Sequence, residues 1–258
     1  MSCKGLLLAA LAAAMLTPAR PASASEPFKF GTAVSPDGQT LQVDGLLVSA
    51  SASAQQRQRV SILGDSYSTF IGYIPAGNAI WYTGTTERTD VTSVRQTWWW
   101  KVISEGGYLL EKNDSYSGAT VSFQGYNQAD YRDRSFITRL PRLGSPDILL
   151  IFGCINDSWA GVPVGEYKYE DITVADLYTY RPALACLLDE TQARYPNVEI
   201  YYIIGEGLRE DITESTKVIC DHYGIPYVHL SGIATQEGHP TVAGMDAIAR
   251  QVLALLGK

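Results

Sequence analysis

The sequence predicts an α/β protein, a three-layer α/β/α sandwich in which helices cover both faces of a parallel sheet. Three observations support this prediction. Short aliphatic runs recur along residues 57–258, these runs are apolar throughout instead of alternating with polar residues, and helical patterns separate them. Such strands are typical of a parallel sheet that is buried on both faces. Because 46% of the residues are hydrophobic, the chain can fill one large core.

Five runs have the length and composition of buried strands. In chain order they span residues 60–63, 108–112, 147–152, 198–204 and 227–230. We expect one five-stranded sheet in the flavodoxin-like order 2-1-3-4-5. In that order the carboxyl ends of the first and third strands flank the switch point where open α/β sheets bind ligands.

Helical patterns lie between the strands and after the last one. They span residues 97–104, 174–194 with a break or restart at Pro182, 211–223 closed by Gly224, and a final helix after Pro240. Residues 70–96 fit neither pattern, because they are rich in Gly, Thr, Tyr and Trp and show no helical period. Long loops inside a compact domain are usually binding elements, so we interpret this segment as a wall of the cleft.

The first 56 residues precede the strand-and-helix pattern. Residues 1–24 have the features of a secretory signal peptide, with a cation before the apolar run 6–16 and a small-x-small cleavage site at 22–24. Residues 25–56 are interpreted as an N-terminal extension and linker, and residues 57–258 as the main domain. We therefore expect an exported protein, periplasmic or extracellular, and no other apolar run approaches the length that spans a bilayer.

Charge and cysteine content argue against several classes of function. The net charge is −7, and removing the two cations of residues 1–24 leaves 18 Lys and Arg against 27 Asp and Glu, or −9. An acidic chain without a basic stripe is a poor partner for nucleic acid or an anionic membrane. The spacing of Cys154, Cys186 and Cys220 allows one disulfide but fits no metal knuckle. We expect no metal and no other cofactor.

A serine follows the first strand, in Gly64-Asp65-Ser66. By itself this tripeptide is an ordinary turn and N-cap, but a serine at the sheet edge can act as a nucleophile if a base lies nearby. Only three histidines can serve. His222 at a helix end is most simply solvated, and His229 inside a strand is most simply a core residue. His239, in a loop before the final helix, can reach over the sheet edge.

Two further positions can stabilise an oxyanion. Asn156 follows the third strand, and its amide can donate a hydrogen bond, although an Asn-Asp turn is the simpler interpretation. Gly118 follows the second strand, and a glycine exposes its backbone N–H closely to a site. Standing alone, Gly118 would be interpreted as a turn residue.

Four short motifs, taken in their order along the chain, resemble the SGNH (GDSL-like) hydrolase superfamily over about residues 59–256. They are Gly64-Asp65-Ser66, Gly118, Asn156-Asp157 and His239-Pro240. The chain is also similar to a secreted bacterial subgroup that shares the stretches 115–120 and 156–159. The resemblance implies an ester hydrolase with Ser66 as nucleophile and His239 as base.

The same resemblance implies an oxyanion hole formed by the backbone N–H groups of Ser66 and Gly118 and by the side chain of Asn156. Two positions depart from the family pattern. Cys154 stands where the family usually has glycine in Gly-x-Asn-Asp, and Gln236 stands where the pattern Asp-x-x-His has aspartate.

The loss of the aspartate leaves three alternatives for orienting His239. Glu237 substitutes from the neighbouring position, a carboxylate elsewhere does so, or the site works as a Ser-His dyad oriented by Gln236 or by a backbone carbonyl. We favour the dyad, since Glu237 would need its loop to turn a different face inward. In serine proteases, the carboxylate that is hydrogen-bonded to the imidazole contributes a factor of about 10⁴ to kcat. The presence of Gln236 instead of aspartate therefore bears directly on how this site would work.

The sequence therefore predicts an exported serine esterase for small acyl esters, such as O-acetyl groups on carbohydrate, with a small-molecule or glycan ester as substrate. If they line the cleft, aromatic residues offer stacking faces for sugar rings: Tyr73, Trp81, Tyr82 and Trp159. Arg134 can bind an anionic substrate group or form a surface ion pair. Two alternatives are a lipase or acyl hydrolase, and a degenerate domain that Gln236 would leave as a carbohydrate-binding module.

Overall fold

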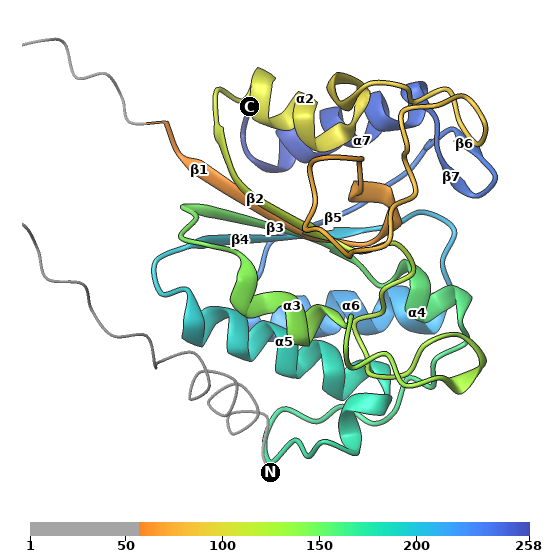
Figure 1. Ribbon diagram of the computed structural model, residues 1–258. Coiled ribbons are helices and arrows are strands. Elements are labelled where there is room, and N and C mark those ends of the chain that lie inside the picture. Colours follow the sequence, from red (N-terminus) through yellow and green to blue (C-terminus); the bar gives the residue numbers. More distant parts are fainter. Residues whose placement is uncertain (1–56) are drawn as a thin grey trace, which may run out of the picture. The chain divides into compact units, whose positions relative to one another are not determined.

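The computed structural model describes residues 57–258, which form a five-stranded parallel sheet with helices on both faces (Figure 1). The expected signal peptide (1–24) and the extension and linker (25–56) lie outside the described residues. The strands are β1 (Arg59–Gly64), β2 (Leu109–Ser115), β3 (Ile148–Gly153), β4 (Glu199–Ile204) and β5 (Tyr227–His229). Their order is β2-β1-β3-β4-β5 and every pairing is parallel, so the predicted sheet is confirmed.

The burial of the central strands explains their composition. All six residues of β3 are buried, and β1 is buried from Val60 onward. Both strands are covered on two faces, and polar residues at alternate positions would therefore be desolvated without a partner. The edge strand β5 is short and only half buried.

The helices form the two outer layers of the sandwich. They are α2 (Trp98–Glu105), α3 (Phe136–Arg139), α4 (Ile155–Trp159), α5 (Tyr180–Arg194), α6 (Glu210–Tyr223) and α7 (Val242–Leu255). In Figure 1, α2 and α7 lie together on one face, whereas α3, α5 and α6 cover the other. Within residues 57–258, no helix combines the length and the apolar character that crossing a bilayer requires.

The predicted helix over residues 174–194 is two elements. A 3₁₀ turn covers Asp176–Tyr178, and α5 starts at Tyr180, so Pro182 lies in its first turn. Proline is tolerated there because the N–H groups of the first turn have no partner within the helix. Gly224 ends α6 with φ of 65°, as the sequence predicts.

Several short elements were not predicted. These are α3, α4, the strands β6 (Thr235–Gln236) and β7 (His239–Pro240), and the 3₁₀ turns η1 (Ser66–Ser68), η2 (Val94–Gln96), η3 (Tyr126–Gln128) and η4 (Leu140–Arg142). Each is too short to show a periodic pattern. Most of them lie near the carboxyl edge of the sheet, where they determine the geometry of the candidate site.

Candidate active site

Ser66 stands at the carboxyl edge of the sheet, two residues after the end of β1. Asp65 caps the 3₁₀ turn that Ser66 begins, because its Oδ1 accepts a hydrogen bond from the Tyr67 N–H at 3.0 Å. The turn fits tightly at Gly64, where a Cβ atom would come within 2.7 Å of side-chain atoms of Ser68 and Ser115. Glycine is therefore needed before the serine for steric reasons.

His239 lies in β7 and reaches Ser66 across the site. Its Nε2 is 2.9 Å from the Ser66 Oγ, and its Nδ1 is 3.0 Å from the backbone carbonyl oxygen of Glu237. A carbonyl can only accept, so this contact assigns the proton to Nδ1 and leaves Nε2 as acceptor for the serine hydroxyl. This is the tautomer that a general base for Ser66 requires.

A two-residue hairpin places that carbonyl on the imidazole. Gln236 in β6 pairs with His239 in β7, and the connecting residues Glu237 and Gly238 have φ of 48° and 73°. Two successive positive φ values are typical of the type I′ turn that joins two-residue hairpins. The side chains of Gln236 and Glu237 are exposed, and within residues 57–258 neither is hydrogen-bonded to His239.

Four aromatic side chains surround the imidazole. The Trp81 ring stacks on it with centroids 3.5 Å apart and planes inclined by 8°, and Trp159 approaches it edge-on at 5.9 Å. Tyr67 donates from its hydroxyl to the Gly238 carbonyl at 2.6 Å, and Tyr82 donates to the Pro240 carbonyl at 2.9 Å. The backbone on both sides of His239 is therefore held in place.

This environment disfavours the protonated imidazole. Burial lowers the pKa of His239 to about 4, the Glu237 carbonyl acts in the opposite direction, and the Arg88 charge lowers it further. A histidine with such a pKa is neutral at physiological pH and can accept a proton. No carboxylate contributes to the shift.

Asn156 and Gly118 lie at the same sheet edge. Asn156, in α4, donates from Nδ2 to the Ala119 carbonyl at 3.0 Å and accepts at Oδ1 from the Tyr126 hydroxyl at 2.8 Å. These bonds fix the orientation of the amide and leave one of its two N–H groups for another acceptor. Gly118 has φ of 81° and open space where a Cβ would stand. Within residues 57–258, the N–H groups of Ser66 and Gly118 donate no hydrogen bond.

The GDSL-like Lipase/Acylhydrolase family profile matches residues 58–256. The chain belongs to this family. It is 54% identical to a protein from Bacteroides ovatus named as a GDSL-like lipase, over 79% of this chain and 99% of that chain, with a TM-score of 0.78. A second GDSL-like lipase structure, from Bacteroides uniformis, is 51% identical over 79% and 97% of the two chains, with a TM-score of 0.77.

More distant structures share the fold of this GDSL-like ester hydrolase. One is a carbohydrate esterase whose active site has divergent catalytic and non-catalytic binding functions, with 14% identity, a TM-score of 0.57, and coverage of 87% of this chain and 69% of that chain. No curated protein matches the chain.

A buried arginine supports the turn that carries Ser66, and the sequence analysis missed it. Arg139 is inaccessible to solvent and donates to the carbonyl oxygens of Arg134, at 2.8 Å, and Gly64, at 3.1 Å. It also donates to the Asp114 carbonyl and lies 3.4 Å from the Asp114 carboxylate. In contrast, Arg134 itself pairs with the exposed Asp133, which is the surface ion pair considered above.

Two buried aspartates flank the site. Burial raises the pKa of Asp65 to about 7 and that of Asp157 to about 6. Asp157 accepts from the N–H groups of Val121 and Ser122 at 2.8 and 3.0 Å, which fixes the loop that follows Gly118. Asp157 therefore has a structural role in positioning the loop.

The remaining histidines lie elsewhere. His222 is exposed at the end of α6 and stacks on Tyr169 with centroids 3.7 Å apart. The interpretation of His229 as a core residue is wrong, because β5 is an edge strand and its side chain is exposed.

Cys154 and Cys220 are free and buried. Cys154 adopts φ of 71°, the left-handed conformation that the family glycine takes without strain. The turn into α4 therefore keeps the backbone of the family pattern despite the cysteine. Residues 57–258 contain no group of His, Cys, Asp and Glu that could hold a metal ion.

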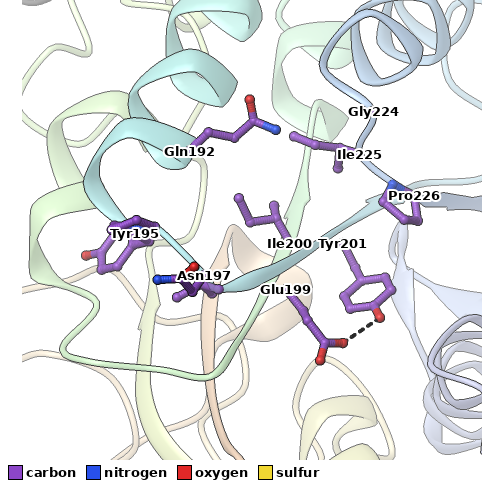
Figure 2. Close-up of a pocket in the computed structure, with 11 residues that line it drawn as sticks. Gln192, Tyr195, Asn197, Glu199, Ile200, Tyr201, Gly224, Ile225 and Pro226 are labelled. Carbon is purple, nitrogen blue, oxygen red and sulfur yellow. Dashed lines mark hydrogen bonds between the residues drawn. The ribbon is translucent and has the colours of Figure 1, made fainter.

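A separate hollow lies at the opposite edge of the sheet (Figure 2). It surrounds the first residues of β4, where the Tyr201 hydroxyl donates to the Glu199 carboxylate at 2.9 Å, and Ile225 and Pro226 form part of its wall. Ser66 stands beyond the carboxyl ends of the strands, whereas this hollow stands at the amino end of β4. None of the predicted site residues lines it.

Proposed function

We propose that this ester hydrolase is a serine esterase that removes small acyl groups, such as acetyl, from carbohydrate. The observation that carries the proposal is the 2.9 Å contact between the Ser66 hydroxyl and the neutral Nε2 of His239. A hydroxyl hydrogen-bonded to a neutral imidazole at a sheet edge is the arrangement that serine acyl transfer requires. The leader-like residues 1–24 support the further proposal that the enzyme is exported to the periplasm or the extracellular space.

In the proposed mechanism, the Ser66 Oγ attacks the ester carbonyl carbon while His239 Nε2 takes the hydroxyl proton. The oxyanion accepts hydrogen bonds from the N–H groups of Ser66 and Gly118 and from the Asn156 amide. The tetrahedral intermediate collapses when the imidazolium gives its proton to the leaving alcohol. Water then attacks the acyl-enzyme, His239 takes the water proton, and the acid leaves as Ser66 regains its hydrogen.

We propose that the Glu237 carbonyl, and not a side chain, orients His239. The double variant Gln236→Ala/Glu237→Ala keeps this carbonyl, so its kcat for p-nitrophenyl acetate is expected to stay within about threefold of wild type, the range of effects that leave transition-state contacts intact. A fall of kcat by a factor on the order of 100 would show that one of the two side chains carries the orientation.

The low pKa of His239 predicts activity in acid. The base must be unprotonated, so kcat/KM falls as pH drops through the pKa of His239 in the free enzyme. With that pKa at about 4, the acid limb lies near pH 4 instead of near the ordinary histidine value of about 6.5. The check is the profile of kcat/KM from about pH 3 to 8, with circular dichroism at each pH to exclude unfolding. Because burial raises the pKa of Asp65 to about 7 and that of Asp157 to about 6, an inflection near the ordinary histidine value contradicts the assignment only if NMR titration places the pKa of His239 there as well.

The substrate proposal rests on the aromatic side chain that is accessible beside the site. Of the four aromatics considered for sugar stacking, Tyr82 is buried, and Trp81 has one face covered by His239. Tyr73 is 40% exposed, but its ring contacts are with Phe70, Trp99 and Trp100 instead of His239. Trp159 is 44% exposed and lies edge-on to His239. An exposed aromatic face next to the base can stack against a sugar ring.

Small acyl groups are favoured by the hollow beside the nucleophile turn. It has a volume of about 200 Å³ and is lined by Tyr67, Glu206, Leu230, Ile233 and Thr235. A long alkyl chain would meet the charge of Glu206, whose pKa is lowered because its carboxylate accepts from the N–H groups of Ile233 and Gly232. Desolvating a carboxylate against an alkyl chain is unfavourable.

Replacing Trp159 by Ala is expected to raise KM for acetylated oligosaccharides by about fivefold, because a lost stacking contact costs about 1 kcal/mol. The kcat for p-nitrophenyl acetate, which has no sugar ring, is expected to change little. Equal loss on both substrates would show that Trp159 does not act on the sugar.

A panel of acetate, octanoate and palmitate esters tests the lipase alternative. Faster hydrolysis of the long-chain esters would favour that alternative.

A fluorophosphonate probe tests the proposed function directly. The wild-type enzyme is expected to be labelled at Ser66 and to lose its esterase activity in parallel, whereas Ser66→Ala remains unlabelled. Absence of labelling together with retained binding of acetylated glycans would favour the carbohydrate-binding module instead.

A further inference from the structure

The imidazole of His239 has an unusual pair of partners. Its Nδ1 meets a neutral carbonyl, and one of its faces is covered by the indole of Trp81, nearly parallel and 3.5 Å away between centroids. A general base becomes an imidazolium during acyl transfer, and serine proteases stabilise that charge with a carboxylate. Here the groups in contact with the ring carry no negative charge, so the added stabilisation must come from dipoles and from the aromatic face.

The stack is fixed from two sides. The backbone N–H of Trp81 donates to the Thr69 Oγ1 at 3.0 Å, and that hydroxyl donates to the Ser66 carbonyl at 3.0 Å. Next to it, the Tyr82 hydroxyl donates to the Pro240 carbonyl, one residue beyond His239. The backbone at Trp81 is therefore linked through Thr69 to the backbone of Ser66, and the neighbouring Tyr82 is linked to the backbone of Pro240. Its buried Nε1 has no hydrogen-bond partner within residues 57–258, so ring contacts and backbone bonds determine where the ring lies.

We propose that Trp81 is a positioning residue whose π face stabilises the imidazolium form of His239, replacing part of the electrostatic contribution of the absent aspartate. This inference rests on the proposed function of His239 as base. A cation is attracted to the negative face of an aromatic ring, indole gives the largest effect, and the attraction grows when water is excluded. His239 is 5% exposed, so the interaction takes place in a largely dry site.

Arg88 adjusts the strength of this interaction. Its guanidinium lies over the Trp81 ring at 4.8 Å from the centroid, and its charge lowers the pKa of His239. The guanidinium repels the imidazolium and attracts the same π electrons. The other titratable groups at the ring, Tyr67 and Tyr82, remain neutral hydroxyls because burial raises the pKa of each.

The test replaces Trp81 alone with tryptophans that carry increasing numbers of fluorine atoms, introduced site-specifically into the full chain. Fluorine withdraws density from the π face and changes the ring shape little. We expect kcat for p-nitrophenyl acetate, measured well above the acid limb, to fall steadily by about tenfold over the series. The same substitutions at Trp100, a half-buried residue of α2 whose ring contacts Tyr73 and Trp99 instead of His239, are expected to leave kcat unchanged. A flat series at Trp81 would overturn the proposal.

A second measurement separates this proposal from the proposed function. NMR titration of His239, one of only three histidines, reports its pKa without turnover. Arg88→Gln is expected to raise that pKa, and fluorination of Trp81 to lower it again. If fluorination shifted neither the pKa nor kcat while Ser66 remained essential, the proposal for Trp81 would fail and the esterase mechanism would stand. If Ser66 proved dispensable but fluorination lowered the pKa, the stacking interaction would stand and the mechanism would fail.

Discussion

Ser66→Ala is expected to lower kcat for p-nitrophenyl acetate by a factor on the order of 10⁴ to 10⁶. In the proposed mechanism, the variant removes the atom that forms the acyl-enzyme, and His239 Nε2 then has no hydroxyl to deprotonate. The side chain of Ser66 contacts His239, so the variant keeps the bonds that hold the turn. These bonds run from the Tyr67 N–H to the Asp65 carboxylate and from the Arg139 guanidinium to the Gly64 carbonyl. The melting temperature is therefore expected to change little.

Ser68→Ala is the matched control for this variant. Ser68 is also buried in the same 3₁₀ turn, but its hydroxyl accepts from the Trp98 indole at 3.3 Å instead of contacting His239. We expect it to lose about 1 kcal/mol of stability and to keep its kcat within a few-fold of wild type. Steady-state kinetics and thermal unfolding of both variants separate the two roles. Retention of more than a few per cent of kcat by Ser66→Ala would contradict the nucleophile assignment.

The parallel sheet could be predicted because each of its strands has a local sequence signal, a short run of apolar residues. Runs such as 147–152 are buried on both faces, so burial alone determines their composition. The ends of these strands meet at one edge, and blocks that stand far apart in the sequence therefore converge there. This is why Ser66, Gly118, Asn156 and His239 could all be selected before their distances were known.

The groups around His239 could not be predicted in the same way. The Glu237 carbonyl reaches the ring only because a two-residue hairpin forms, and its sequence signal, Glu237-Gly238, is weaker than Asn-Gly or Asp-Gly. The Trp81 stack depends on the path of residues 70–96, which have no periodic pattern to indicate where a side chain points. The sequence analysis therefore found the missing aspartate but not the groups that surround the ring in its absence.

Arg139 was missed for a related reason. The sequence suggests a surface position for Arg139, because arginine is seldom fully buried, even beside apolar residues such as Ile137 and Leu140. The structure instead brings it under β1 and β2, between the Gly64 carbonyl and Asp114. Only the three-dimensional arrangement shows that the turn carrying Ser66 is held by a buried charge.

Arg139→Met is expected to destabilise the domain by about 3–5 kcal/mol, because it leaves the Asp114 carboxylate buried without its cation. Methionine fills a similar volume but donates to none of the carbonyls of Gly64, Asp114 and Arg134. Burial lowers the pKa of Arg139 to about 10, so the guanidinium is charged at neutral pH. Its removal leaves the Asp114 carboxylate without a counter-charge. Urea unfolding gives the change in free energy.

The activity of the folded Arg139→Met fraction is also expected to fall, because Gly64 immediately precedes Asp65 and Ser66 and loses the donor that holds its carbonyl.

Two further variants identify the cause of the lost stability. Arg142→Met, at an exposed position in the adjacent 3₁₀ turn, is expected to change stability by less than about 0.5 kcal/mol. Adding Asp114→Asn to Arg139→Met removes the unpaired charge and should recover part of the loss. If the double variant were no more stable than Arg139→Met, the lost packing and backbone hydrogen bonds, and not the buried, unpaired charge of Asp114, would account for the destabilisation.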